Sequence, residues 1–151
     1  MRIPSHIEKV KRLTALRQRF DPFADFELWF WATLTAGTNM LNASLHRAGL
    51  TSDDPVFSSI PGVHMVRQPD GSYTRELRGL GDVSHVNWPP VEGAPEHIRR
   101  LEQTLEAIEQ YRDPCVRGDE TPTKSVIEDC ERAFAEAFSI YTQTMDDARL
   151  A

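Results

Sequence analysis

Residues 26–48 read FELWFWATLTAGTNMLNASLHRA, and this stretch decides the architecture that the sequence predicts. Apolar and small side chains recur along it every three or four residues, which is the spacing of one buried helix face. Asp21 and Pro22 precede the stretch as a helix cap and a first-turn residue, and Gly49 follows it as a left-handed C-terminal cap. We therefore predict a long, largely buried helix that begins at Pro22 and ends before Gly49.

A second face of the same helix is polar. Its members are Trp31, Thr35, Thr38, Asn39, Asn42 and His46. A buried hydroxyl or amide without a hydrogen-bond partner costs about 1–3 kcal/mol, so these groups need partners if the helix is enclosed. We expect this face to be covered by other parts of the fold rather than open to water.

Three interpretations of the polar face are open. In a structural one, threonines bond to carbonyls one turn earlier, Gly37 lets a neighbouring helix approach, and the Asn and His side chains hold a distant segment. In a binding one, Trp31 forms the wall of a pocket, Asn39 and Asn42 orient a ligand, and His46 titrates near neutral pH. In a third, the face packs across the two-fold axis of a homodimer.

Three further helices are predicted from the same three- and four-residue periodicity. One extends from Ser5 to Arg19, with Ser5 and Glu8 at the spacing of a capping box and with Ile7, Val10, Leu13, Leu16 and Phe20 as its apolar stripe. Another begins at Pro95 and ends at Asp113-Pro114. The last begins at Thr121-Pro122 and extends to Asp146. The chain is therefore predicted to be mainly α, as a four-helix bundle in a single domain, 1–151.

Residues 50–93 interrupt the helical pattern with prolines and glycines, and form a long crossover between the second and third predicted helices. Within it, residues 63–68 and 72–77 flank Pro69-Asp70-Gly71, which predicts a β-hairpin. A segment of this length in a small domain covers a site, extends an interface or is partly disordered. We expect it to lie over the polar helix face.

Composition excludes some classes of function. The formal net charge of −6 argues against a broad nucleic-acid-binding surface, although six basic residues lie in the first 20 positions beside Glu8 alone. No apolar stretch has the length of a membrane span or a secretory signal, so we expect a cytoplasmic protein that does not enter a membrane.

No catalytic or metal-binding motif is present in the sequence. His64, Asp82, His85 and His97 include the residue types of a zinc or iron site, but no HxxxH, HExxH or ExxH spacing occurs among them. Neither Cys115 nor Cys130 belongs to a CxxC pair, and no GxSxG marks a nucleophile. The sequence therefore assigns no metal, no cofactor and no catalytic residue.

The segment Asn42-x-x-x-His46-Arg47 resembles the Arg-to-His signature of HEPN-type helical ribonucleases, with Asn42 in place of the leading arginine. The resemblance implies an enzyme that acts on RNA or a phosphorylated ligand, with His46 as acid or base and an arginine as phosphate stabiliser. Arg112 and Arg117 are the candidate arginines if their helix ends near His46.

The leading prediction is a non-enzymatic homodimer that binds a small molecule or a protein partner at the polar face of the second helix. The competing prediction is the small enzyme just described. Replacing His46 separates them, because it should weaken ligand affinity in the first case and turnover in the second.

Overall fold

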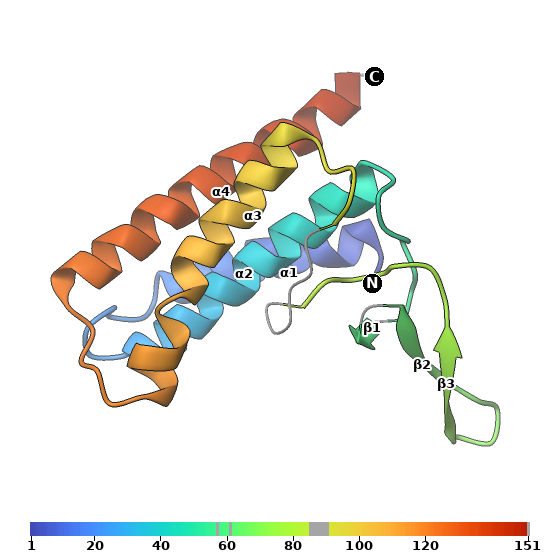
Figure 1. Ribbon diagram of the computed structural model, residues 1–151, viewed down its shortest axis with the longest axis horizontal. Helices are drawn as coiled ribbons and strands as arrows, with labels where there is room; N and C mark the ends of the chain where they lie inside the picture. The colour runs from blue at the N-terminus through green and yellow to red at the C-terminus, as the bar shows by residue number, and fades with distance from the viewer. Residues whose placement is uncertain (57, 61, 85–90, 151) are drawn as a thin grey trace.

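The computed structural model describes residues 1–56, 58–60, 62–84 and 91–150. Four long helices occur in these ranges: α1 (Ile3–Arg17), α2 (Phe26–Arg47), α3 (Glu96–Glu109) and α4 (Lys124–Leu150) (Figure 1). They confirm the prediction of a mainly α four-helix bundle with a long crossover between the second and third helices. Among the described helices, none combines the length and the apolar character needed to cross a lipid bilayer.

Helix α2 is the centre of the bundle, and it contacts each of the other three helices. Most of its large apolar side chains are almost completely buried in the core, although Leu28 is 59% exposed. At Gly37, α2 and α3 approach so closely that a Cβ atom would lie 2.2 Å from Cδ2 of Leu105. The absence of a side chain at this position therefore permits the contact, as the structural interpretation of the polar face expected.

The C-terminal end of α2 is as predicted. Gly49 has a φ of +71°, and the N–H groups of Gly49 and Leu50 donate to the carbonyl oxygens of His46 and Leu45. This pair of bonds is the Schellman motif that a glycine after a helix favours. It directs the chain away from the bundle and into the crossover.

The predicted start of α2 is wrong, because the helix begins at Phe26 rather than at Pro22. The Asp21 carboxylate accepts hydrogen bonds from the backbone N–H groups of Phe23 and Ala24. These bonds close a separate turn, so Asp21 caps that turn instead of the long helix.

Helix α1 also differs from its prediction. It begins at Ile3 with no side-chain cap, so the capping box of Ser5 and Glu8 is wrong. Its most buried residues are His6, Val10 and Arg17, whereas Leu16 of the predicted stripe is 36% exposed. The helix is therefore rotated so that two polar side chains face the bundle.

Arg17 stabilises this rotation. Its guanidinium donates to the hydroxyl of Thr33 and to the Glu131 carboxylate, at 2.9 and 2.7 Å, and lies 4.1 Å from the centroid of the Phe134 ring. A buried arginine with charge, hydrogen bonds and an aromatic face is fully partnered. It joins α1 to both α2 and α4.

The last two helices have shifted ends. Helix α3 ends at Glu109 and is followed by a π-helical segment, η1 (Arg112–Arg117), where the sequence predicted a continued helix to Asp113-Pro114. Helix α4 begins at Lys124 rather than at Thr121-Pro122, because the Thr123 hydroxyl accepts the backbone N–H of Val126.

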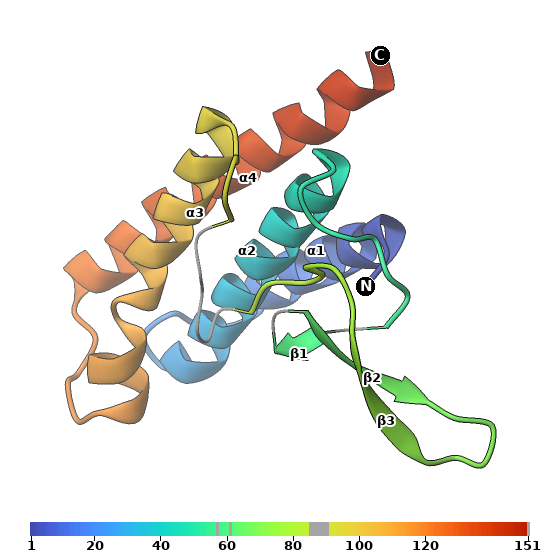
Figure 2. The same cartoon turned by 45° about the vertical axis from the view of Figure 1, so that its right-hand side comes forward.

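The crossover contains a three-stranded antiparallel sheet in the order β1-β2-β3, with β1 (Ser58–Ile60), β2 (Val63–Arg67) and β3 (Tyr73–Leu77). The predicted hairpin is confirmed, and Val63 pairs with Leu77 while Arg67 pairs with Tyr73. Strand β1 was not predicted, since three residues are too few to show an alternating pattern. Figures 1 and 2 show that the hairpin points away from the bundle, while the chain after β3 returns to it.

Candidate functional site: a buried histidine–aspartate cluster

Three separate segments bring together His6, His46 and Asp82, which we call the His–Asp cluster. His6 lies on α1, His46 lies in the last turn of α2, and Asp82 lies on the crossover after β3. Oδ1 of Asp82 is 2.6 Å from Nε2 of His6 and 3.0 Å from Nε2 of His46. The two imidazole nitrogens and the carboxylate thus converge on one point.

The cluster is enclosed. Relative exposures are 1% for His6, 6% for His46 and 1% for Asp82. The two rings are inclined at 49° with their centroids 5.2 Å apart, so they flank the carboxylate without stacking. The amine of Met1 also donates to Oδ2 of Asp82.

The outer nitrogen of each imidazole is held by an oxygen. Nδ1 of His6 lies 2.8 Å from Oδ1 of Asn39, and Nδ1 of His46 lies 2.5 Å from the hydroxyl of Thr51. The Asn39 amide is itself oriented, because its Nδ2 donates to the carbonyl of Thr35 at 2.8 Å. Its Oδ1 must then accept from Nδ1 of His6, which places a proton on that nitrogen.

The proton on Nδ1 determines which partner the other ring nitrogen of His6, Nε2, can accept. With Nδ1 donating to Asn39, a neutral ring presents the lone pair of Nε2 to an oxygen of Asp82. Two lone pairs 2.6 Å apart repel unless a cation is shared between them. A second proton on the ring fits this distance, whereas a metal ion would need the two atoms to be more than about 3 Å apart. The geometry therefore calls for positive charge at the centre of the cluster.

The carboxylate is held in its ionised form. Burial alone would raise the pKa of Asp82, but hydrogen bonds from His46, His6 and the Met1 amine outweigh this effect and hold the pKa well below its ordinary value. Asp82 is therefore an anion at neutral pH, with its negative charge directed at both imidazoles.

The residue types of the cluster, two histidines and an aspartate, are those of a transition-metal site. One ligand atom from each of the three residues can be chosen so that all lie within 4.8 Å of one another. Imidazole nitrogens and carboxylate oxygens bind Zn²⁺ at about 2.0–2.2 Å, so ligand atoms around one ion are at most about 4 Å apart. The three side chains would therefore have to adjust for all three atoms to bind one ion, with His6 Nε2 and Asp82 Oδ1 moving apart from 2.6 Å.

A cavity of about 280 Å³ adjoins the cluster at His6. It lies between α1, α2 and the crossover. Its lining comprises Met1, His6, Lys9, Thr35, Thr38, Asn39, Asn42, Val83 and Ser84. Four of the six residues predicted for a ligand site are thus on the wall of one cavity.

The polar face of α2 is enclosed, as expected. Thr38 and Asn39 are each 7% exposed and Asn42 is 1% exposed, while Thr35 is half-buried. Trp31 is half-buried beside Phe30 and does not line this cavity, so its role as the wall of a ligand pocket stays a prediction. His46 belongs to the cluster rather than to the cavity lining.

The asparagines serve the protein itself. Nδ2 of Asn42 donates to the carbonyl of Val83 at 2.9 Å, and the N–H of Val83 donates back to Oδ1 of Asn42 at 2.7 Å. Thr38 donates to the carbonyl of Leu34 one turn earlier. The predicted role of Asn39 and Asn42 as ligand-orienting amides has no support in these contacts, because both amides are used within the fold.

Most of the residues that the sequence suggested for a metal site lie outside the His–Asp cluster. His97 is exposed at the start of α3, and His64 is buried on β2, where neither ring nitrogen has a hydrogen-bond partner among the described residues. His85 lies outside the described residues. Of that set only Asp82 enters the cluster.

His6 was missed because it stands beside the apolar stripe that the sequence suggested for α1. His6 and Val10 are one helical turn apart, and this spacing indicates that both lie on the same face of the helix.

The arginines of the ribonuclease hypothesis do not accompany His46. Arg112 pairs with Glu109 and Asp113, and Arg117 lies 3.9 Å from Asp113. Figure 1 shows that the end of α3 and η1 lie near the start of α2, whereas His46 is at its other end. The two candidate arginines are therefore at the opposite end of the bundle.

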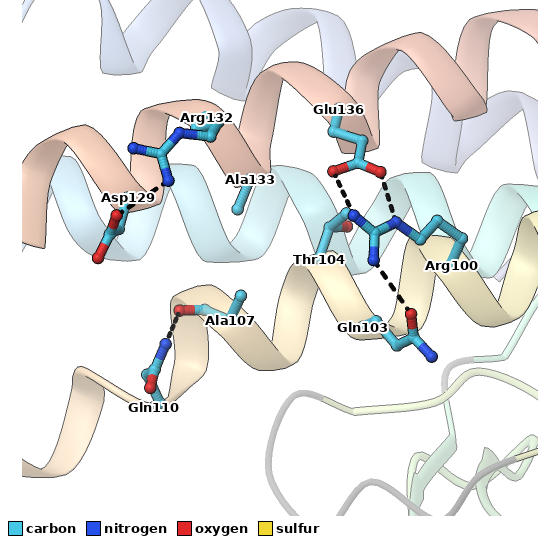
Figure 3. Close-up of a pocket in the computed structure, with 9 residues that line it drawn as sticks. All are labelled: Arg100, Gln103, Thr104, Ala107, Gln110, Asp129, Arg132, Ala133 and Glu136. Atoms are coloured by element: carbon cyan, nitrogen blue, oxygen red, sulfur yellow. Dashed lines mark hydrogen bonds and ion pairs between the residues drawn. The ribbon is translucent and has the colours of Figure 1, made fainter.

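A second polar concavity of about 220 Å³ lies between α3 and α4, and we call it the α3–α4 groove (Figure 3). Both nitrogens of one edge of the Arg100 guanidinium bind the Glu136 carboxylate, at 2.5 and 3.0 Å. Arg132 donates to Asp129 at 3.1 Å. The charged groups of the α3–α4 groove are paired with one another, so the groove offers a ligand no uncompensated charge.

Comparisons with protein-family profiles, with curated proteins and with solved structures gave no significant match to this chain.

Proposed function

We propose that this protein binds a divalent transition-metal ion between His6, His46 and Asp82, and that the polar face of α2 forms a small-molecule site beside that ion. The observation that carries the proposal is the convergence of both Nε2 atoms on one carboxylate oxygen, with both Nδ1 atoms held from behind. Metal-binding histidines in proteins are oriented in this way, by an oxygen on the nitrogen that does not bind the metal.

The donor set favours particular ions. Two imidazoles and a carboxylate suit Zn²⁺ or Fe²⁺, and the absence of sulfur from the cluster disfavours Cu⁺. Catalytic zinc sites use three protein ligands and leave a fourth position to water or substrate. The same number of ligands here supports a functional centre rather than a closed structural one.

A bound ion also resolves the charge problem inside the cluster. It would replace the second proton of His6 and face the ionised Asp82. Since the ligands come from α1, α2 and the crossover, metal binding would join these three segments and stabilise the folded state.

The opposing possibility is a metal-free network in which an imidazolium satisfies Asp82. To separate the two, the chain is expressed without a histidine tag and its metal content is measured, followed by titration of metal-free protein with Co²⁺ and Zn²⁺. We expect one ion per chain, a visible Co²⁺ absorption band displaced by Zn²⁺, and a melting temperature that rises with Zn²⁺ and falls with a chelator.

Three variants locate the site. His6→Ala, His46→Ala and Asp82→Asn should each abolish the Co²⁺ band, whereas His97→Ala, which removes an exposed histidine, should retain it. Circular dichroism establishes that each variant is folded. The metal site is disproved if Zn²⁺ does not change the melting temperature of the wild-type protein and if its metal content equals that of Asp82→Asn. The metal-free hydrogen-bonded network then remains.

The predicted homodimer concerns an assembly that a single chain does not test, and it stays a prediction.

A further inference from the structure

The cavity beside the His–Asp cluster has two polar groups that the protein does not use. Lys9, half-buried on α1, forms no ion pair with any described residue. The hydroxyl of Thr35 makes no hydrogen bond within the described ranges, although the backbone carbonyl of Thr35 accepts from Asn39. These two groups face the same space from α1 and α2.

The hydrogen bonds of Asn39, Asn42 and Thr38 in the cavity wall are all made within the protein. Asn39 is shared between His6 and Thr35, and Asn42 is shared between Val83 and Thr38. The Thr38 hydroxyl donates its hydrogen to Leu34. A ligand would therefore meet one ammonium group and one hydroxyl that have no partner among the described residues, on a wall whose asparagines are already bonded within the fold.

The electrostatics of the cavity favour a negative ligand. No Asp or Glu is among its lining residues, and Asp82, the carboxylate of the cluster, already accepts from the Met1 amine and lies within hydrogen-bond distance of both imidazoles. The α1 side of the cavity belongs to the basic first 20 residues of a chain whose formal net charge is −6. A bound divalent ion would add further positive charge beside His6.

We propose that this cavity binds a small aliphatic carboxylate, with the carboxylate on Lys9 and Thr35. One ammonium and one hydroxyl match a monoanion, whereas a phosphate dianion is usually held by more donors or by arginine. The inference rests on the proposed function, since it names the ligand class of the space beside the metal ion.

Two steps of one experiment keep the two proposals apart. Uptake of one Zn²⁺ per chain tests the proposed metal site. The loaded protein, labelled with ¹⁵N, is then titrated at fixed ionic strength with butyrate, with its neutral analogue butyramide and with inorganic phosphate. We expect saturable shifts of the Lys9 and Thr35 amide signals with butyrate, and none with butyramide.

Variants assign the contacts. Lys9→Met should weaken butyrate binding by about tenfold or more, because a charge-assisted hydrogen bond is lost. Thr35→Val should have a smaller effect, and Lys11→Met, an exposed lysine on the same helix, should have none. Zn²⁺ affinity should stay the same in all three variants.

The inference fails if the Zn²⁺-loaded protein shows no saturable shift with butyrate, if butyramide binds as well, or if Lys11→Met weakens binding as much as Lys9→Met. Tighter binding of phosphate than of butyrate also overturns it, in favour of a phosphorylated ligand. A protein that does not take up Zn²⁺ overturns the proposed function instead, and the butyrate titration then reports on the cavity alone.

Discussion

The His–Asp cluster and the α3–α4 groove contain similar chemical groups in opposite settings. In the groove, Arg100 and Glu136 are 53% and 39% exposed and form a bidentate ion pair on the surface. In the cluster, the Asp82 and His6 side chains are each 1% exposed. Water screens the first pair and is excluded from the second, so the buried pair has the larger energetic consequences although the exposed pair is bidentate.

Asp82→Ala should have the largest effect, because it removes the anion on which both imidazoles converge. Breaking a buried charge pair costs about 3–5 kcal/mol, since the remaining partner stays buried and unpaired. We expect a loss of this size in the free energy of unfolding, measured by urea denaturation of metal-free protein. Asp119→Ala, at an exposed position, is the matched control and should be neutral. Equal stability of the two variants would show that the cluster is open to solvent.

Asn42→Ala should have the next largest effect. The Asn42 amide binds both the N–H and the carbonyl of Val83, so its removal leaves two buried backbone groups without these partners. A loss of about 1–3 kcal/mol is expected for an unsatisfied buried polar group. Hydrogen exchange at Val83 should accelerate in the variant, while Gln143→Ala on the exposed side of α4 should change neither quantity. Unchanged exchange at Val83 would mean that the crossover is held by other contacts.

The cluster should also make stability depend on pH. An Asp in the unfolded chain has a pKa of about 3.9, and the hydrogen bonds to Asp82 hold its folded pKa well below that. The unfolded state then binds the proton more tightly, so the stabilisation is complete above the unfolded pKa and is lost as pH falls toward the folded pKa.

Urea titrations of metal-free protein should show this loss between about pH 5 and pH 2. Asp82→Asn, which lacks the titrating group, should lose less stability over the same range. Parallel pH profiles for the two proteins would contradict the lowered pKa.

The helical bundle could be predicted because its sequence signals are local. The His–Asp cluster could not be predicted, because it joins residues that are far apart in the sequence. The periodicity of α2 and the turn signals at Gly49 and in residues 69–71 are readable within a few neighbouring residues. His6 and Asp82 are 76 positions apart, and Asp82 lies in a segment without any periodic pattern. The rotation of α1 that turns His6 inward depends on the contacts of Arg17 with α2 and α4, which are tertiary.

Arg100→Ala should have the smallest effect, although the pair that it breaks has the better geometry. Both the guanidinium and the carboxylate of Glu136 recover solvation when separated, and side chains at this exposure gain freedom. We expect a free energy of unfolding close to that of the wild-type protein, and a double-mutant cycle with Glu136→Ala whose coupling declines further in high salt. A coupling as large as the effect of Asp82→Ala would show that burial is not what distinguishes the two regions, and the α3–α4 groove would then need to be treated as a second structural centre of the bundle.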